Sequence, residues 1–356
     1  MSGEVMRLRE AAALLSDWYR EVERPLPWRE SPTPYHVWLS EIMLQQTRIE
    51  AVIPYYERFT RELPDVAALS QVDDEKLMKL WEGLGYYSRA RNLKKAAQAV
   101  MELHGGELPR TAKELRKLAG IGPYTAGAIA SIAFGEPEPA VDGNVLRVVA
   151  RLLADPSDIM LPATRERVTD QLRETYPEAG EACRVLTQAW MELGERVCIP
   201  NGTPKCEECP VRALCLAHEA GAEEEYPVRS AKKPRRIEQR TVLLLFCGDK
   251  FAVRRRPESG LLAGLWEFPS LDGEVNEDGV RDYLREIGLS AGMITPTAPA
   301  KHIFTHIEWH MSGFAVDVSK IGSSEFVWVT AEEWLRDYAA PTAYRAFTKL
   351  VSEREF

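Results

Sequence analysis

Residues 118–144 read LAGIGPYTAGAIASIAFGEPEPAVDGN, and this stretch says more about the fold than any other part of the chain. The segment GIGPYTAG lies between two apolar patterns with helical spacing, which predicts two helices joined by a glycine-rich hairpin. Pro123 suits a first helical turn, so we expect the second helix to begin there. The free N–H groups at such a start can bind phosphate. An ordinary helical hairpin is the alternative.

Three glycines and one aspartate complete this stretch. Gly120, Gly122 and Gly127 are expected to adopt backbone conformations closed to other residues and to let a second backbone approach closely. Asp142 follows Gly122 by 20 residues, and either Asp142 or Gly143 is expected to begin the helix of VLRVVARLL.

Composition describes a globular protein. The chain has 356 residues, 45% of them apolar and 28% charged, which is enough for two or three domains with real cores. It contains no apolar run of membrane-spanning length. The first 20 residues read as an amphipathic helix without the features of a signal peptide, so we expect a cytoplasmic protein with no membrane contact.

Charge gives a mixed message about nucleic acid. The net charge of −9 argues against a nucleic-acid partner, because neutralising phosphate needs Lys and Arg. Basic residues nevertheless gather at 229–240 and at Arg89, Arg91, Lys94 and Lys95. The total charge therefore does not exclude DNA.

The chain divides into a helical part and an α+β part. Thr33 and Pro34 signal the start of a helix, and helical spacing continues through residues 35–59. Residues 226–240 are charged, contain proline and have few apolar side chains, which is typical of a linker. Beyond them we expect strands at 241–247, 251–256, 302–318 and 325–330, and helices at 275–288 and 330–338.

Four of the six cysteines lie close together in the sequence: Cys198, Cys206, Cys209 and Cys215. The pair Cys206-x2-Cys209 lets two thiolates reach one metal from a single turn, and the outer two complete a four-sulfur site. Zinc and a [4Fe–4S] cluster both accept four thiolates, so spacing alone leaves both open. Cys183 and Cys247 are expected to be ordinary buried thiols.

These motifs, in this order, resemble the endonuclease III superfamily of helix-hairpin-helix glycosylases, and within it the MutY-type adenine DNA glycosylases. The resemblance implies a multidomain protein: an all-α helix-hairpin-helix glycosylase core with an iron–sulfur module, and a C-terminal α+β Nudix-like domain. The implied ranges are a catalytic domain at 1–225, its hairpin at 118–135, an iron–sulfur module from the N-terminal helix and 140–220, a linker at 226–240 and the Nudix-like domain at 241–356. Besides the cysteines, the matching motifs are LPWR (26–29), SEIMLQQTR (40–48), WEGLGYYSRARN (81–92), GIGPYTAGAIAS (120–131), AVDGNVLRV (140–148) and GLLAGLWEFP (260–269).

The resemblance also implies an activity, a cofactor and a partner. The expected reaction is hydrolytic removal of adenine mispaired with 8-oxoguanine or guanine in double-stranded DNA, by a monomer associated with the nucleoid. The four cysteines would bind a [4Fe–4S] cluster. Their first gap has seven residues where six are usual, and Gly202 is expected to absorb the extra residue in a loop.

Breaking a purine glycosidic bond needs a neutral acid to protonate the base and an anion to stabilise the sugar cation. Glu41 lies in the apolar sequence WLSEIM, where burial would disfavour its charged form, and the resemblance assigns it to the acid. An exposed helical glutamate is the alternative. Asp142 fits the anion, because a helix start helps to keep a carboxylate charged. A plain helix cap is compatible with that role.

Tyr124 stands where bifunctional relatives carry lysine. A lysine amine can form a Schiff base with the sugar and then cleave the strand, whereas tyrosine can only donate or accept a hydrogen bond. We therefore expect a monofunctional glycosylase, in which Asn144 orients the Asp142 side of the site. The alternatives are an endonuclease III-like glycosylase/lyase and a non-catalytic iron–sulfur DNA-binding sensor.

The remaining roles come from the resemblance alone. The implied adenine pocket consists of Trp28, Arg29, Leu44 and Gln188. The implied DNA-binding and wedge residues are Gln46, Thr47, Leu84, Tyr86, Gly120, Gly122 and Gly127. The implied 8-oxoguanine recognition loop is Phe304, Thr305 and His306, with threonine where the family has serine. A strand with a buried histidine is the alternative for this last segment.

The C-terminal domain is expected to have lost pyrophosphatase chemistry. The stretch nearest to a Nudix motif is RDYLREIGL (281–289), where Arg285 replaces a metal-binding glutamate. A cation at a ligand position opposes Mg²⁺ binding, so base recognition alone is expected to remain.

Overall fold

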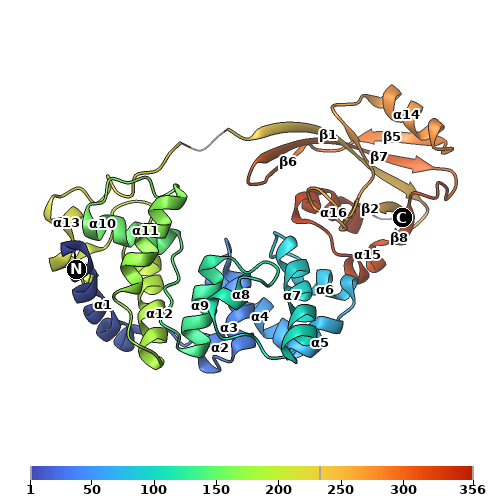
Figure 1. Cartoon of the computed structure of the whole chain (residues 1–356). Coiled ribbons are helices and arrows are strands. Elements are labelled where there is room, and N and C mark those ends of the chain that lie inside the picture. The colour runs from blue at the N-terminus through green and yellow to red at the C-terminus, as the bar shows by residue number, and fades with distance from the viewer. Residues whose placement is uncertain (1, 232–233, 355–356) are drawn as a thin grey trace. The chain divides into compact units, whose positions relative to one another are not determined.

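A computed structural model describes residues 2–231 and 234–354 (Figure 1). The contacts divide the chain into two compact units, Met1–Val72 with Arg91–Ala231 and Asp73–Ala90 with Lys232–Phe356. Of the basic run predicted in the linker, Lys232 and Lys233 lie outside the described residues. None of the described helices is long and apolar enough to cross a membrane.

Every regular element described in the first unit is a helix or a helical turn, as the sequence predicts. Its N-terminal helix packs on the last long helix, and both contribute to one core with α10. Three of the clustered cysteines pack against that core. The elements are α1 (Gly3–Val22), α2 (Pro27–Glu30), α3 (Pro34–Leu44), α4 (Ile49–Glu62), α5 (Val66–Gln71), α7 (Ser88–His104, which begins in the second unit), α8 (Ala112–Leu115), α9 (Pro123–Phe134), α10 (Gly143–Leu153), α11 (Pro162–Arg173), α12 (Glu181–Arg196), α13 (Leu216–Glu219), and short 3-10 turns at Cys206–Glu208 and Arg212–Leu214.

The hairpin of residues 118–135 has the predicted start of its second helix at Pro123. Gly120 has a φ of +76°, and a Cβ at Gly127 would lie 2.4 Å from the carbonyl oxygen of Pro139, so both positions need glycine. The same expectation is wrong for Gly122. This residue is the N-cap of α9 with a φ of −84°, and space around it is open. Its missing side chain instead leaves the N–H groups of α9 uncovered.

The helical run predicted for residues 35–59 is interrupted. Thr33 caps α3 as expected, with its hydroxyl accepting from the backbone N–H of His36. The helix ends at Leu44 and α4 begins at Ile49, because Gln46 takes a left-handed φ of 59°. Apolar spacing persists across the break, so periodicity alone did not reveal it. The break exposes the backbone of 45–48 beside a cavity described below.

The second unit contains a mixed sheet with helices on both faces. Its sheet runs in the order β3-β2-β1-β7-β5, with β4 beside β1, β6 beside β7 and β8 beside β2. Only the β1–β7 pair is parallel among the described strands. The elements are α6 (Asp74–Trp81), β1 (Arg236–Cys247), β2 (Lys250–Arg255), β3 (Trp266–Glu267), β4 (Ser270–Asp272), α14 (Glu277–Glu286), β5 (Ala291–Pro296), β6 (Ala300–Ile303), β7 (Ile307–Val318), β8 (Val327–Thr330), α15 (Ala331–Asp337), α16 (Arg345–Glu353), and a 3-10 turn at Thr342–Tyr344.

Alternation along β1 explains the two layers. Val242 and Leu244 belong to a core that includes Trp334 of α15 and Phe347 of α16. Leu243 and Leu245 face the opposite core, which contains α14. Because successive strand side chains point to opposite faces, one apolar run supplies both cores.

Two predicted boundaries in this unit are wrong. β1 begins at Arg236, inside the predicted linker, and its charged first residues pair with β7 from Ile307 onward. Composition suggested a linker because these strand residues are mostly exposed. The strand predicted at 302–318 is two strands, β6 and β7, separated by residues 304–306.

Candidate active site

One cavity of about 830 Å³ in the first unit gathers the predicted catalytic and adenine-pocket residues. This volume is in the range of small-molecule sites. The residues come from α2, α3, the 45–48 break, α9, α10 and α12, which are far apart in the sequence. The predicted residues that line it are Trp28, Arg29, Glu41, Leu44, Gln46, Thr47, Gly122, Tyr124, Asp142, Asn144 and Gln188.

Glu41 is a buried carboxyl group on α3, a helix whose residues are buried at almost every position. The Tyr124 hydroxyl donates to Oε2 of Glu41 over 2.9 Å. Burial raises the pKa of Glu41 to about 7, and the charge of Asp142 adds to that effect, while Tyr124 and Arg29 oppose it. Glu41 can therefore hold a proton near neutral pH, and the alternative of an exposed helical glutamate is wrong.

Asp142 is the N-cap of α10, as predicted. Its Oδ1 accepts from the backbone N–H groups of Asn144 and Val145, each over 2.8 Å. Burial raises the pKa of Asp142, although these two N–H donors and Arg147 oppose it. The helix start thus acts in the direction expected from the sequence, but the loss of water around the carboxyl has the larger effect.

Asn144 has a defined amide orientation. Its Nδ2 donates to Oδ2 of Asp142 over 2.9 Å, while its Oδ1 accepts from Nη2 of Arg147 over 3.0 Å. Arg147 is buried and also donates to the carbonyl oxygens of Gly194 and Cys198, over 2.6 and 2.8 Å. Sequence reasoning missed Arg147, whose signal was a charge among the apolar residues of VLRVVARLL.

Arg29 is held by a buried carboxylate that sequence reasoning also missed. Its Nη2 donates to Oε2 of Glu192 over 2.8 Å, and its guanidinium lies 5.5 Å from the centroid of the Tyr19 ring. Nε of Arg24 lies 2.5 Å from the other oxygen of Glu192. Burial acts to raise the pKa of Glu192, but the two arginines outweigh it and hold the pKa below its ordinary value. A signal was available: Glu192 follows Gln188 by one helical turn on α12.

We predict that Glu192→Gln destabilises the protein by about 2 kcal/mol, because two arginines lose their shared buried counterion. That magnitude is reduced because a quarter of the Arg24 side chain remains exposed. Urea denaturation at pH 7 measures the change. Glu195→Gln is the matched control, since Glu195 is 41% exposed and pairs with Arg24 at the rim. Equal effects of the two substitutions would contradict the assignment.

Two of the predicted wedge residues, Leu84 and Tyr86, lie in the second unit on the loop after α6, whereas the third, Gln46, lies in the first unit. Leu84 is buried, whereas Tyr86 is 45% exposed and has a left-handed φ of 48°. Arg89 donates to the carbonyl oxygens of Leu84 and Gly85, over 3.0 and 3.1 Å. This loop therefore has a defined shape that leaves the Tyr86 ring accessible.

Residues 304–306 form the turn between β6 and β7 rather than a continuous strand. The Phe304 ring packs at 4.9 Å from that of Trp309, while Thr305 and His306 are exposed. The alternative of a strand with a buried histidine is wrong for His306. The Tyr86 hydroxyl lies 3.4 Å from Oγ1 of Thr305, so predicted wedge and recognition residues meet within this unit.

The four clustered cysteines border one small cavity beneath α10 and α12. Around a single tetrahedral zinc ion, thiolate sulfurs would lie about 3.8 Å apart, given zinc–sulfur bonds of about 2.3 Å. Among the described residues, no three of the four sulfur atoms lie within 4.8 Å of one another. Gly202, in the long first gap, has a φ of +76° in open space.

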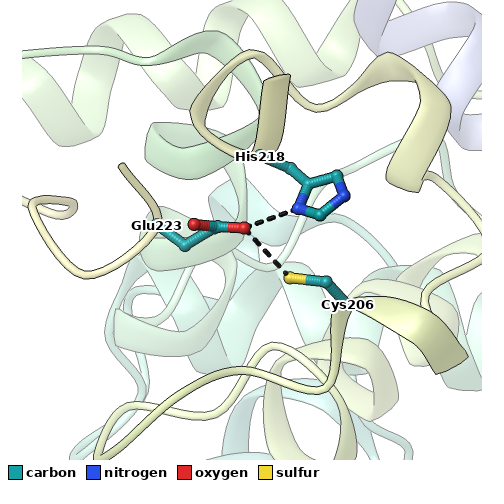
Figure 2. A group of neighbouring side chains, drawn as sticks. All are labelled: Cys206, His218 and Glu223. Carbon is teal, nitrogen blue, oxygen red and sulfur yellow. Dashed lines mark hydrogen bonds and ion pairs between the residues drawn. The ribbon is translucent and has the colours of Figure 1, made fainter. Parts of the chain in front are cut away.

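A second group of possible metal ligands shares Cys206 with this cavity. Figure 2 shows Oε1 of Glu223 between Nδ1 of His218, at 2.5 Å, and Sγ of Cys206, at 3.6 Å. Burial raises the pKa of the Cys206 thiol to about 11, and Glu223 adds to it. Because Cys206 belongs to both sets, the three residues do not form a separate site. His218 and Glu223, which sequence reasoning did not identify, lie beside Cys206, one of the four predicted cluster ligands.

Comparisons with known proteins bear on the family and the fold of the chain. Residues 39–178 match the HhH-GPD superfamily of base excision DNA repair proteins, and residues 241–350 match the NUDIX domain. The chain is 35% identical to an adenine DNA glycosylase of Homo sapiens, over 85% of this chain and 66% of that protein, just under two thirds. It is 33% identical to the adenine DNA glycosylase of Rattus norvegicus, over 95% of this chain and 77% of that protein. A solved thermostable thymine-DNA glycosylase has a TM-score of 0.55 and 26% identity, over 60% of this chain and 98% of that one.

Proposed function

The chain belongs to the adenine DNA glycosylase family, and from that premise we propose that it removes adenine mispaired with 8-oxoguanine or guanine in double-stranded DNA. The reaction is hydrolysis of the N-glycosidic bond. The observation that carries the proposal is the pair of carboxyls on one cavity, with Glu41 hydrogen-bonded to Tyr124 and Asp142 at a helix start. Both carboxyls are buried, but Glu41 accepts from a hydroxyl and Asp142 from two backbone N–H groups, and this difference in partners suits an acid and an anion.

Glu41 donates its proton to the leaving adenine. Its raised pKa keeps a useful fraction protonated near pH 7, and the Tyr124 hydroxyl orients the carboxyl. Asp142 stabilises the cation that develops on the sugar, directly or through a transient covalent bond. Asn144, fixed between Asp142 and Arg147, orients the carboxylate that faces the sugar.

The flipped adenine occupies the remainder of the cavity. Gln188 is buried, and its amide can pair with both a donor and an acceptor of adenine. Trp28 and Leu44 supply apolar walls, and Arg29 a donor held in place by Glu192. Thr47, at the break between α3 and α4, and the hairpin glycines Gly120 and Gly122, which precede α9, bind the DNA beside the cavity. Gln46, at the same break, fills the gap beside the opposite base.

Recognition of the opposite base is assigned to the second unit. Phe304 supports the turn from below, and the exposed Thr305 and His306 offer a hydroxyl and an imidazole to 8-oxoguanine. The exposed Tyr86 enters the space left beside that base, and the buried Leu84 packs inside the loop that carries it.

Single-turnover excision on duplexes with adenine opposite 8-oxoguanine, guanine or thymine tests the proposal. We expect strand breakage only after alkali, fastest opposite 8-oxoguanine and slower opposite guanine. Absence of an alkali-labile site at adenine opposite 8-oxoguanine would refute the proposed function.

We predict that the enzyme does not cleave the strand, because Tyr124 has no amine to form a Schiff base. Borohydride should trap at most traces of a covalent adduct with DNA. Tyr124→Phe should lower excision by about tenfold through loss of one hydrogen bond to a carboxyl, with no gain in trapping. A stable adduct at wild-type levels with turnover-competent β-elimination would instead favour the glycosylase/lyase alternative.

We propose that Cys198, Cys206, Cys209 and Cys215 bind a [4Fe–4S] cluster. The support is the four-thiol donor set around one cavity. Nη1 of Arg151 lies 3.3 Å from Sγ of Cys198 and would balance thiolate charge. A bound cluster would cross-link the four cysteines and so hold this loop-rich segment against α10 and α12.

We predict about four iron atoms and four acid-labile sulfides per chain in the purified protein. Cys209→Ala should lose most of both, because three ligands hold the cluster weakly. Cys183→Ala, which alters a buried cysteine outside the cavity, is the matched control. One zinc ion per chain with no iron would contradict the assignment.

A further inference from the structure

Two side chains at the end of α6 contact the end of α15 within the second unit. Nζ of Lys79 donates to the carbonyl oxygens of Leu335 and Tyr338, over 2.6 and 3.0 Å. Oε1 of Glu82 accepts from the backbone N–H of Ala340 over 2.7 Å. Figure 1 shows α6 and α15 side by side, although about 250 residues of sequence separate them.

The contact matches the chemistry of a helix end. The last carbonyls of a helix have no partner inside it and carry partial negative charge, so a lysine is favoured there. Lys79 and Glu82 also form an ion pair at 2.7 Å, with only 27% and 28% of their side chains exposed. Together the pair satisfies two carbonyls and one N–H at the end of α15. Trp266 and Ala339 border a small cleft beside it, together with Met78 of α6.

This pair is adjacent to the loop that carries the proposed wedge. Nε1 of Trp81 donates to the carbonyl oxygen of Gly85 over 3.1 Å, and Arg89 donates to the same oxygen and to that of Leu84. These hydrogen bonds hold the loop in one conformation. A displacement of Glu82 therefore also displaces Tyr86. At its far end the Tyr86 hydroxyl lies beside Thr305 of the recognition turn.

We propose that Lys79 and Glu82 are positioning residues for substrate specificity, which fix the wedge loop 84–86 against the domain that contains the recognition turn 304–306. The inference rests on the proposed function. With the pair in place, the two elements that touch the base opposite adenine form one rigid surface. Without it, the recognition turn binds 8-oxoguanine but no longer determines where Tyr86 enters the duplex, and the advantage of 8-oxoguanine over guanine is lost.

The test compares full-length wild type with Lys79→Met and with the conservative variant Lys79→Arg, which can still donate to two carbonyls. The readout is the ratio of single-turnover rates on adenine opposite 8-oxoguanine and opposite guanine, with enzyme in excess over the duplex. We expect Lys79→Met to lower this ratio about tenfold, as loss of charge-assisted hydrogen bonds implies. The rate opposite guanine should change less than about twofold, and Lys79→Arg should restore most of the ratio.

Arg285→Met is the matched control, because Arg285 forms an exposed ion pair with Asp282 on α14, away from this contact. An unchanged ratio in Lys79→Met would overturn the proposal. A parallel fall on both duplexes would also overturn it, since that result means general destabilisation.

Hydrogen exchange of the free protein gives a readout that does not depend on excision. Lys79→Met should speed exchange at Ala340 and in residues 82–86, while residues of β1 stay protected. Unchanged exchange at Ala340 would mean that the contact is not formed in solution. Failure of the wild type to excise adenine would refute the proposed function, whereas the exchange result would still decide whether the contact exists.

Discussion

Glu41→Gln is expected to lower single-turnover excision of adenine by about a thousandfold or more, because the amide cannot donate the proton that the leaving base needs. Binding of the duplex should remain, since glutamine keeps the size of Glu41 and can still accept from the Tyr124 hydroxyl. Rapid-quench kinetics together with equilibrium binding separate the two effects. Loss of less than about tenfold would mean that another group protonates adenine.

The same residue predicts two pH effects. Because the reaction uses protonated Glu41, with a pKa of about 7, wild-type excision should fall about tenfold per pH unit above neutrality. The folded state also holds this proton more tightly than the unfolded chain, so stability should decline as pH rises from about 4.5 to 7. Over this pH range the free energy of unfolding should fall by about 3 kcal/mol.

Glu41→Gln should therefore be more stable than wild type at pH 8 and nearly equal to it at pH 4.5. Urea denaturation at the two pH values measures this difference. Glu50→Gln, at an exposed position on α4, is the matched control and should change neither stability nor excision. A Glu41→Gln variant that is less stable than wild type at pH 8 would show that the carboxyl is not desolvated.

Asp142→Asn is expected to lower excision by about 10²–10³-fold, because the anion that faces the sugar cation is lost. The fold should survive, since asparagine caps a helix as well as aspartate does. Single-turnover kinetics and thermal unfolding together test this separation of roles.

Asp65→Asn provides the matched control for the cap. Asp65 caps α5 by accepting from the backbone N–H of Ala68 over 2.8 Å, outside the cavity. Excision by this variant should stay within about twofold of wild type. If Asp142→Asn retained more than about a tenth of the wild-type rate, the negative charge would not be required.

Local patterns in the sequence predicted the helix starts that contribute residues to the site. Pro123 marked the start of α9 and Asp142 the cap of α10, because the backbone chemistry of a helix start depends on only a few neighbouring residues. The apolar neighbours of Glu41 correctly predicted its burial. These features need no knowledge of distant contacts.

Partners across the fold were not predictable from local patterns. Glu192 accepts a hydrogen bond from Arg29 across 163 positions of sequence, and no local pattern around either residue predicts this pairing. The break after Leu44 was also missed, because both helices continue one apolar spacing and a single left-handed residue, Gln46, separates them. In the C-terminal domain the exposed start of β1 had the composition of a linker. Its pairing with β7, a long-range contact, makes it a strand.

The grouping of residues 73–90 with the C-terminal sheet has a consequence for biosynthesis. On the ribosome α6 emerges early, but α15 follows about 250 residues later. At elongation rates of about 5–20 residues per second, about 12–50 s pass between the synthesis of Lys79 and that of its carbonyl partners. The carbonyl contacts of α6 in the second unit thus form only after α15 has been synthesised. This can be tested by protease cleavage at Lys79 in nascent chains stalled before and after α15. Cleavage should be faster in the chains that lack α15.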